Sequence, residues 1–257
     1  MKKTLITGAV ITSAVLGVLV TGNAMAADMK APAPVYTKAP MAPAFSWTGC
    51  YIGAGGGYGM WNQDTFHVSN GTGVAISPTQ TGGGRGWFGT AQVGCDYQIA
   101  SSWVIGVQGD WDWGSLKGSP NFANGNVGDE KNSWTWAAGG RIGYVVMPQL
   151  LGFVSGGYTQ AHFDQVNFVG DVSGLPNNLF VADHTYHGWY LGTGYEYGIS
   201  FLPGLFWKTE YRYSEFQADL LPHLFVSTGL TNGTSSNSQK FIQTIRSELV
   251  WRFNWFH

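Results

Sequence analysis

The side chains with the greatest capacity for chemistry are acids and bases that recur at every second position of short segments. Lys208, Glu210 and Arg212 alternate in sign in this way, and Arg246 and Glu248 repeat the pattern. Side chains two apart on an extended segment lie on one face, so these groups would be neighbours that form ion pairs. The complete set on such faces is Asp110, Asp112, Arg141, Glu196, Lys208, Glu210, Arg212, Arg246, Glu248 and Arg252.

Histidine is the other side chain here that could bind a metal. All but His257 fall in long polar stretches or at the ends of extended segments: His67, His162, His184, His187 and His223. His184 and His187 would point to opposite faces of an extended segment, which makes a poor chelate. We interpret these residues as solvated side chains, and a rim of histidines that binds haem or a transition metal is the alternative.

Enzymatic signatures are weak. The glycine-rich run at 53–59 resembles a dinucleotide motif, but no helix follows it to hold a pyrophosphate. The apolar faces offer no Ser/His/acid set of the kind a lipid-modifying enzyme needs. We therefore expect no enzymatic activity, no cofactor and no resident metal.

Composition narrows the class of protein. Charged residues make up 11% of the 257 residues, against roughly 25% in soluble domains, while aromatic residues reach 15% with 12 Trp. The net charge of -2 gives no basic excess for nucleic-acid binding. Mean hydropathy is -0.04, and after the N-terminus no run has the ~18 apolar residues of a membrane helix. This combination is typical of a transmembrane β-barrel.

The N-terminal region predicts export. A charged start and an apolar run precede a small-x-small motif, which predicts a signal peptide at 1–26 cleaved between Ala26 and Ala27. Residues 27–46 are rich in Ala and Pro and are expected to be an extended periplasmic spacer. Residues 47–257 would form the barrel. An exported chain is placed in an oxidising compartment.

Eight alternating segments follow. Each has an apolar set and a polar or glycine-rich set, which period-2 geometry places on opposite faces of a sheet. The segment at 150–163 fits a strand with either face outward. The segments span 47–60, 86–99, 102–114, 133–146, 150–163, 187–200, 205–216 and 241–253.

The connections between these segments indicate their orientation. Links after the second, fourth and sixth segments are only a few residues long, whereas the other four are long and polar. Outer-membrane barrels combine short periplasmic turns with long extracellular loops. We therefore predict an all-β fold, an eight-stranded antiparallel transmembrane β-barrel with both termini in the periplasm. A soluble lipocalin-like barrel is the alternative outside this class.

The segments together resemble a known family. "FSWTGCYIGAGGGYG", "VIGVQGDWDW", "GWYLGTGYEYG", "FWKTEYRYSEF" and "VWRF" are similar to the 25/31-kilodalton outer-membrane immunogenic or porin-like proteins of alphaproteobacteria. The resemblance covers residues 45–253 and implies location in the outer membrane, a surface-exposed role and insertion by the barrel-assembly machinery. Some members are associated with hemin binding. The chain departs from the pattern at Cys50 and Cys95, where an aromatic residue is usual, and it continues past Phe253 to Phe256.

The inward charges lead to two hypotheses for function. An eight-stranded barrel is just wide enough for side chains to fill, so paired charges would plug the lumen and the protein would stabilise the envelope. Alternatively, the same pairs would gate a narrow porin for small solutes, and loop-based ligand capture is a third reading. Lipid is the expected partner, no nucleic acid is expected, and the sequence does not determine an oligomeric state.

The two cysteines and the glycines of the first segment supply the last predictions. Cys50 and Cys95 belong to the outward-facing sets of neighbouring strands, near the periplasmic end of each. This placement suggests a cross-strand disulfide if their Cα atoms lie within roughly 7 Å. The alternative is two lipid-facing free thiols. The odd-numbered glycines of 53–59 would face the lumen and leave room for charged side chains from other strands.

Overall fold

The computed structural model describes residues 46–119, 126–170 and 176–253. All regular structure in this part of the chain is β-strand. No helix long and apolar enough to cross a membrane occurs among the described residues.

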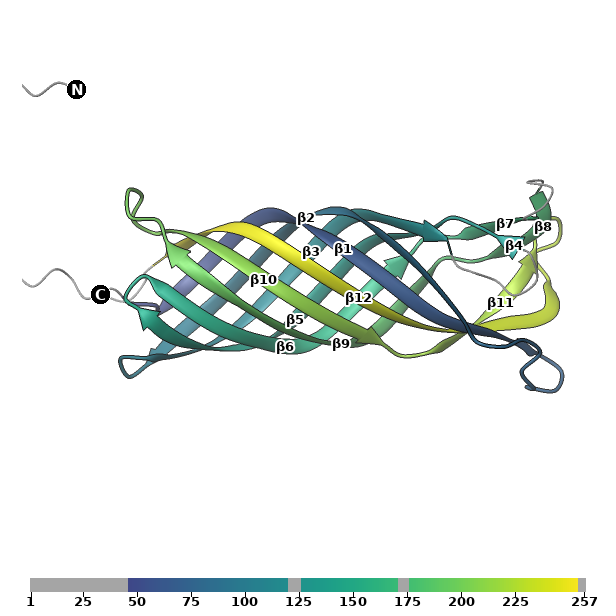
Figure 1. Ribbon diagram of the computed structural model, residues 1–257, viewed down its shortest axis with the longest axis horizontal. Helices are drawn as coiled ribbons and strands as arrows, with labels where there is room; N and C mark the ends of the chain where they lie inside the picture. The colour runs from purple at the N-terminus through teal and green to yellow at the C-terminus, as the bar shows by residue number, and fades with distance from the viewer. Residues whose placement is uncertain (1–45, 120–125, 171–175, 254–257) are drawn as a thin grey trace, which may run out of the picture. The chain divides into compact units, whose positions relative to one another are not determined.

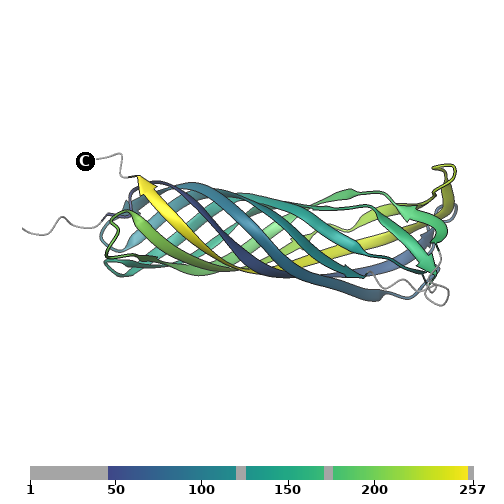
Figure 2. The same cartoon turned by 90° about the horizontal axis from the view of Figure 1, so that it is seen from above.

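Eight long strands form a closed antiparallel ring (Figures 1 and 2). Going around the ring, they follow the chain order, and the last strand pairs with the first. They are β1 (Gly49–Ser69), β2 (Gln80–Ile99), β3 (Trp103–Ser119), β5 (Glu130–Met147), β6 (Leu150–Phe163), β9 (His184–Gly198), β10 (Leu205–Phe216) and β12 (Thr231–Phe253).

Closure of the ring depends on the seam between β1 and β12. This pairing runs without interruption from Cys50 opposite Phe253 to Ser69 opposite Thr234. A closed ring has no unpaired edge, and in lipid every backbone polar group must be satisfied within the protein. The predicted eight-stranded barrel is confirmed.

The strands are longer than the sequence predicts, and the extra length lies at the extracellular end. The segments at 150–163 and 205–216 match β6 and β10, but β1 continues nine residues past Met60 to Ser69, and β12 begins at Thr231 rather than at 241. The extension of β12 is polar throughout, and that of β1 mixes polar residues with apolar ones such as Trp61 and Phe66, which do not continue the alternation. Apolar alternation therefore disappears while strand pairing continues.

The long connections are also more ordered than simple loops. They contribute four short strands: β4 (Asn126–Val127), β7 (Val166–Gly170), β8 (Pro176–Val181) and β11 (Asp219–Phe225). β11 continues the line of β10 along β12, and β8, β7 and β4 follow it in turn. Three of the four extracellular loops thus extend the sheet beyond the ring, whereas the loop between β1 and β2 contributes only an isolated bridge between Val68 and Ala75.

The alternation of faces follows the sequence pattern. On β1, Ile52 and Met60 are outside with half of their surface exposed, whereas Tyr51 is buried in the lumen. The structure also decides the ambiguous segment, because Leu151 and Phe153 of β6 are buried while Val154 is exposed. Every strand of the ring therefore has one face toward the lumen and one face toward the outside of the barrel.

Candidate functional site

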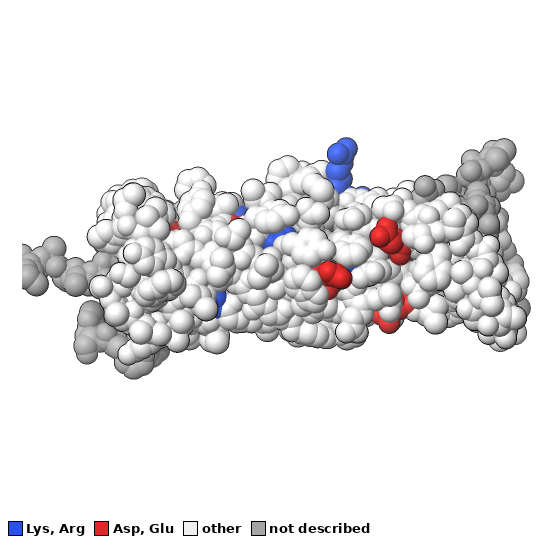
Figure 3. Space-filling model, turned by 60° about the horizontal axis from the view of Figure 1, so that its bottom comes forward, with Lys and Arg blue, Asp and Glu red and all other residues white. Residues whose placement is uncertain are grey.

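The outer face of the ring is apolar and aromatic. Trp87 is 75% exposed, Leu191 60% and Val107 65%, values that would be unfavourable in water. In Figure 3 most atoms on one face of the barrel belong to uncharged residues. Aromatic side chains occur near both ends of this surface, with Trp103 and Tyr144 in contact near the short turns and Trp111 and Trp134 near the long loops. Two aromatic girdles around an apolar band are typical of transmembrane β-barrels.

The lumen contains a square of ion pairs near its periplasmic end. Arg141 donates to Asp96, with its Nε 2.9 Å from Oδ1, and its Nη1 lies 3.2 Å from Glu196. Arg252 completes the square at 2.7 Å from Asp96 and 2.8 Å from Glu196. The four side chains come from alternate strands of the ring, β2, β5, β9 and β12. The square therefore spans the whole lumen.

A second group of charges crosses the middle of the lumen. Arg212 of β10 binds Asp110 of β3 through two bonds of 2.9 Å, and these strands lie opposite each other in the ring. Arg246 reaches the same Asp110 at 3.0 Å and Asp112 at 2.8 Å. Such bidentate Arg–carboxylate pairs are geometrically specific. They join opposite walls of the barrel.

The remaining charges of this middle group form a chain along β10 and β12. Lys208 lies 3.3 Å from Glu210 and 3.8 Å from Glu248. Gln92 bridges them, since it accepts from Lys208 at 2.7 Å and donates to Glu248 at 2.9 Å. Ser155 donates to Glu210 at 2.7 Å. All ten charges predicted to face the lumen are buried there.

Sequence reasoning missed other charged members of the lumen. Asp96 belongs to the inward-facing set of its segment but was not assigned to the charge set, and it pairs with both arginines of the square. Lys240 binds Glu130 at 2.7 Å and also contacts Gln63. Lys240, Glu130 and Gln63 fell in connections that the sequence predicts as loops, so correct strand ends would have revealed them, whereas Asp96 lies within a predicted segment.

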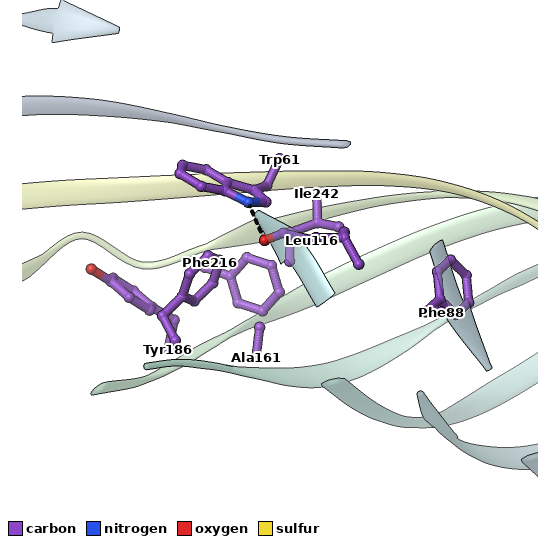
Figure 4. Packing of buried hydrophobic residues seen from close by; sticks show 8 residues of the cluster. Trp61, Phe88, Leu116, Ala161, Tyr186, Phe216 and Ile242 are labelled. Carbon is purple, nitrogen blue, oxygen red and sulfur yellow. Dashed lines mark hydrogen bonds between the residues drawn. The ribbon is translucent and has the colours of Figure 1, made fainter. Parts of the chain in front are cut away.

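Apolar clusters flank the charges, and sequence reasoning missed them as well. At the periplasmic end, Arg252 lies over the rings of Trp47, Tyr51 and Phe206 at about 5 Å. Toward the extracellular end, a cluster around Trp61 fills the lumen (Figure 4). The indole of Trp61 donates to the carbonyl oxygen of Leu116 at 3.0 Å. Aromatic residues thus serve both as lipid-facing girdles and as fillers of the lumen.

The glycine-rich face of β1 makes room for an apolar side chain rather than for the charges. A Cβ atom on Gly57 would lie 2.5 Å from the ring of Phe88, and one on Gly59 would lie 2.7 Å from Leu116. Beside Gly53 the neighbours are Gln92 and Val250. The prediction that these glycines accommodate long charged side chains was wrong. Glycine is required because the backbone of β12 approaches closely, with the Ser247 carbonyl oxygen beside Gly55 and the Ile245 carbonyl oxygen beside Gly57, and because Phe88 packs against Gly57.

Two small cavities lie beside the charged side chains of the lumen. A cavity of about 10 Å³ lies among Phe88, Asp112, Arg212 and Arg246, and another of about 20 Å³ lies near Glu130. A single water molecule needs about 10–15 Å³ of such space. Each of these two cavities has room for about one water molecule.

The two cysteines lie where their parity places them. Cys50 and Cys95 are directly opposite each other on β1 and β2, with Cα atoms 3.9 Å apart, and they are joined as a disulfide. The bond lies on the outer face near the periplasmic end of the barrel. The predicted signal peptide, its cleavage site at Ala26 and Ala27, most of the spacer, and Phe256 lie outside the described residues.

The histidines do not gather at one place. His67 and His223 meet with ring centroids 5.0 Å apart at the extracellular end, and His223 is hydrogen-bonded to Ser236 at 2.7 Å. Burial, and secondarily the neighbouring His67, lowers the pKa of His223 to about 4. His187 bonds Tyr158 on the outer face instead. Among the described residues, no group of three or more His, Cys, Asp or Glu could hold a metal ion.

These features define the class of the protein. A closed ring of eight strands, an apolar band with aromatic girdles and a polar interior are the properties of an outer-membrane β-barrel. The solved structure of OprG from Pseudomonas aeruginosa has the same fold: it superposes with a TM-score of 0.54 over 80% of this chain and 97% of that one, at 10% sequence identity.

Sequence comparison identifies the family. The 31 kDa outer-membrane immunogenic proteins of Brucella melitensis and Brucella suis are each 31% identical to this chain over 200 residues, which cover 75% of this chain and 81% of those proteins. The chain matches no family model. It belongs to the family of the 31 kDa outer-membrane immunogenic protein and is located in the outer membrane, as the resemblance implied.

Proposed function

We propose that this protein is a structural component of the outer membrane, with a lumen closed by ion pairs and no catalytic role. It stabilises the envelope through its lipid-facing surface and presents its extracellular loops to the surroundings. The name of its Brucella relatives supports a surface-exposed, immunogenic role. Outer-membrane lipid and the barrel-assembly machinery are its proposed partners.

The observation that carries this proposal is the bridging of opposite strands by buried ion pairs. The Arg212–Asp110 pair and the square around Asp96 leave no wide path between the walls. A buried charge deprived of its partner is unfavourable by several kcal/mol, so opening a conduit would require several pairs to separate together. The apolar clusters at both ends of the charged region add a second barrier to ions.

Single-channel recording tests the proposal. The refolded full chain in planar bilayers is expected to show only rare, small conductance steps. Arg246→Met, which removes one bridging guanidinium, is expected to increase the frequency of such steps. Leu249→Val on the outer face is the matched control and should behave like the wild type.

Stable openings of nanosiemens size in the wild-type protein would refute the closed lumen. That result would establish the alternative, a porin for small solutes. The refolded state of each variant is checked beforehand by the heat-dependent migration of the barrel on gels, so that a conductance change is measured on folded protein.

A further inference from the structure

The basic residues on the outside of the barrel are concentrated in one row. Apart from the lumen groups, the Lys and Arg residues of the described chain are Arg85, Lys117 and Lys131. They lie on three adjacent strands, β2, β3 and β5. Arg85 is directly opposite Lys117, and Lys117 is directly opposite Lys131.

Such an arrangement is unfavourable by itself. Like charges directly opposite one another on neighbouring strands destabilise a sheet, since their Cβ atoms lie about 5 Å apart. Lys131 is partly neutralised by Asp164 at 3.2 Å. Neither Arg85 nor Lys117 forms an ion pair with any described residue, and both are exposed. The row therefore lacks an anion between its first two members.

The position of the row relative to the membrane indicates where this anion would come from. Trp87 and Trp113 belong to the extracellular aromatic girdle. Toward the extracellular end, Arg85 lies two residues beyond Trp87, and Lys117 lies four residues beyond Trp113. Aromatic girdles mark the level of the lipid headgroups. The cations thus lie just beyond the girdle, at the height of the phosphate groups of the outer leaflet.

The surroundings of the two cations leave room for a bulky headgroup. On the same face, Arg85 is followed outward by Gly83, and Lys117 is flanked by Ser115 and Ser119. The neighbouring outward carboxylates lie farther from the membrane: Asp129 precedes Lys131 on entry to β5, and Asp64 of β1, which accepts from Thr81 at 2.7 Å, is four residues past Met60. On the outer face of β1, β2 and β3, the positive charges therefore lie nearer to the lipid than the negative charge does.

We propose that Arg85 and Lys117 bind a phosphate group of an outer-leaflet glycolipid, with Lys131 at the edge of the site. The guanidinium offers paired N–H donors and the ammonium a point charge, which together suit a phosphate monoester. This site rests on the envelope-stabilising function proposed above and names the lipid chemistry that it uses. The site and the closed lumen can fail separately, because lipid binding is read on the outer face and conductance is read in the lumen.

Native mass spectrometry of the refolded full chain in detergent tests the site. The probes are diphosphoryl lipid A, the same lipid with its phosphates removed, and inorganic phosphate alone. The variant Arg85→Gln/Lys117→Gln is compared with Lys131→Gln, whose ammonium already has a carboxylate partner. Because each basic residue near an anionic lipid surface contributes roughly a fivefold gain in binding, the double variant is expected to bind diphosphoryl lipid A about 30-fold more weakly. The single variant should lose fivefold or less.

Several outcomes would overturn the proposal. Equal binding of phosphorylated and dephosphorylated lipid by the wild-type chain would exclude phosphate recognition, and this comparison requires no variant to fold. Saturation of the site by inorganic phosphate at the same concentration would show a general anion site instead of a lipid site. Equal loss in the double variant and in Lys131→Gln would exclude the assigned pair.

Discussion

The ion pairs of the lumen lead to a quantitative prediction at Arg246. Its guanidinium binds Asp110 and Asp112, and it is the one cation within ion-pair distance of Asp112 among the described residues. In Arg246→Met, Asp110 keeps its two bonds to Arg212, but Asp112 is left buried without a counter-ion. Removing one partner of a buried pair costs about 3–5 kcal/mol. We expect the free energy of unfolding to fall by this amount.

Removing the carboxylate of Asp112, which Arg246→Met leaves without a counter-ion, should restore most of the lost free energy of unfolding. Replacement of a whole buried ion pair by apolar residues of similar volume is often neutral or stabilising. The double variant Arg246→Met/Asp112→Leu is therefore expected to lie within about 1 kcal/mol of the wild-type chain. In the Asp112→Leu single variant Arg246 keeps Asp110 as a partner. Its free energy of unfolding should therefore lie between that of Arg246→Met and that of the double variant.

Urea unfolding in lipid vesicles measures these differences. The folded fraction is followed by tryptophan fluorescence and by heat-dependent migration on gels, and Leu249→Val serves as the control for a change on the outer face. If Arg246→Met loses less than about 1 kcal/mol and the two single effects simply add in the double variant, the charges are not coupled. The lumen would then be hydrated, and the reasoning from buried pairs would be wrong.

Three further predictions concern other parts of the barrel. Replacing Cys50 and Cys95 by alanine should lower the free energy of unfolding by up to about 4 kcal/mol, since the bond closes a loop with a sequence separation of 45; full alkylation of the unreduced protein would show that no bond forms. Gly57→Ala should destabilise the barrel by about 1–3 kcal/mol through overlap with the Ile245 carbonyl oxygen and the Phe88 ring. Gly89→Ala, whose Cβ would meet only the Gly55 carbonyl oxygen at 3.9 Å, should be neutral by the same urea assay. The pKa of His223 is lowered to about 4 from 6.5. Its contribution to the free energy of unfolding is therefore fully present above pH 6.5 and is lost as the pH falls toward 4. Proteolysis of the extracellular end should therefore be faster at pH 4.5 than at pH 7.5, and His223→Gln should remove most of that difference.

The membrane-spanning part of the fold could be predicted from the sequence because lipid imposes a strict alternation there. The segments at 150–163 and 205–216 have the exact bounds of β6 and β10, and the inward charges were assigned by parity alone. Beyond the lipid, both faces of a strand contact water or polar neighbours. Polar runs such as 231–240 therefore carry no signal that separates a strand from a loop.

Packing inside the lumen could not be predicted for a different reason. Parity indicates that Trp61 and Phe88 point inward, but not that they meet, because contact across the ring depends on the stagger of the strands. The pairing of Asp110 with Arg212 depends on the same stagger. Sequence alternation determines the face of each residue, and only the closed ring determines its height relative to residues on the opposite wall.

The length of the seam strands determines how far the protein reaches from the cell. β1 has 21 residues and β12 has 23. At about 3.3 Å per residue and a tilt near 40°, such a strand rises roughly 50 Å along the barrel axis, about twice the ~25 Å apolar band. A collar of paired strands some 20 Å tall thus holds the loop tips well beyond the apolar band. Under the surface role proposed above, an antibody would meet these tips at a height fixed by paired strands, so the tips could change in sequence without losing their reach.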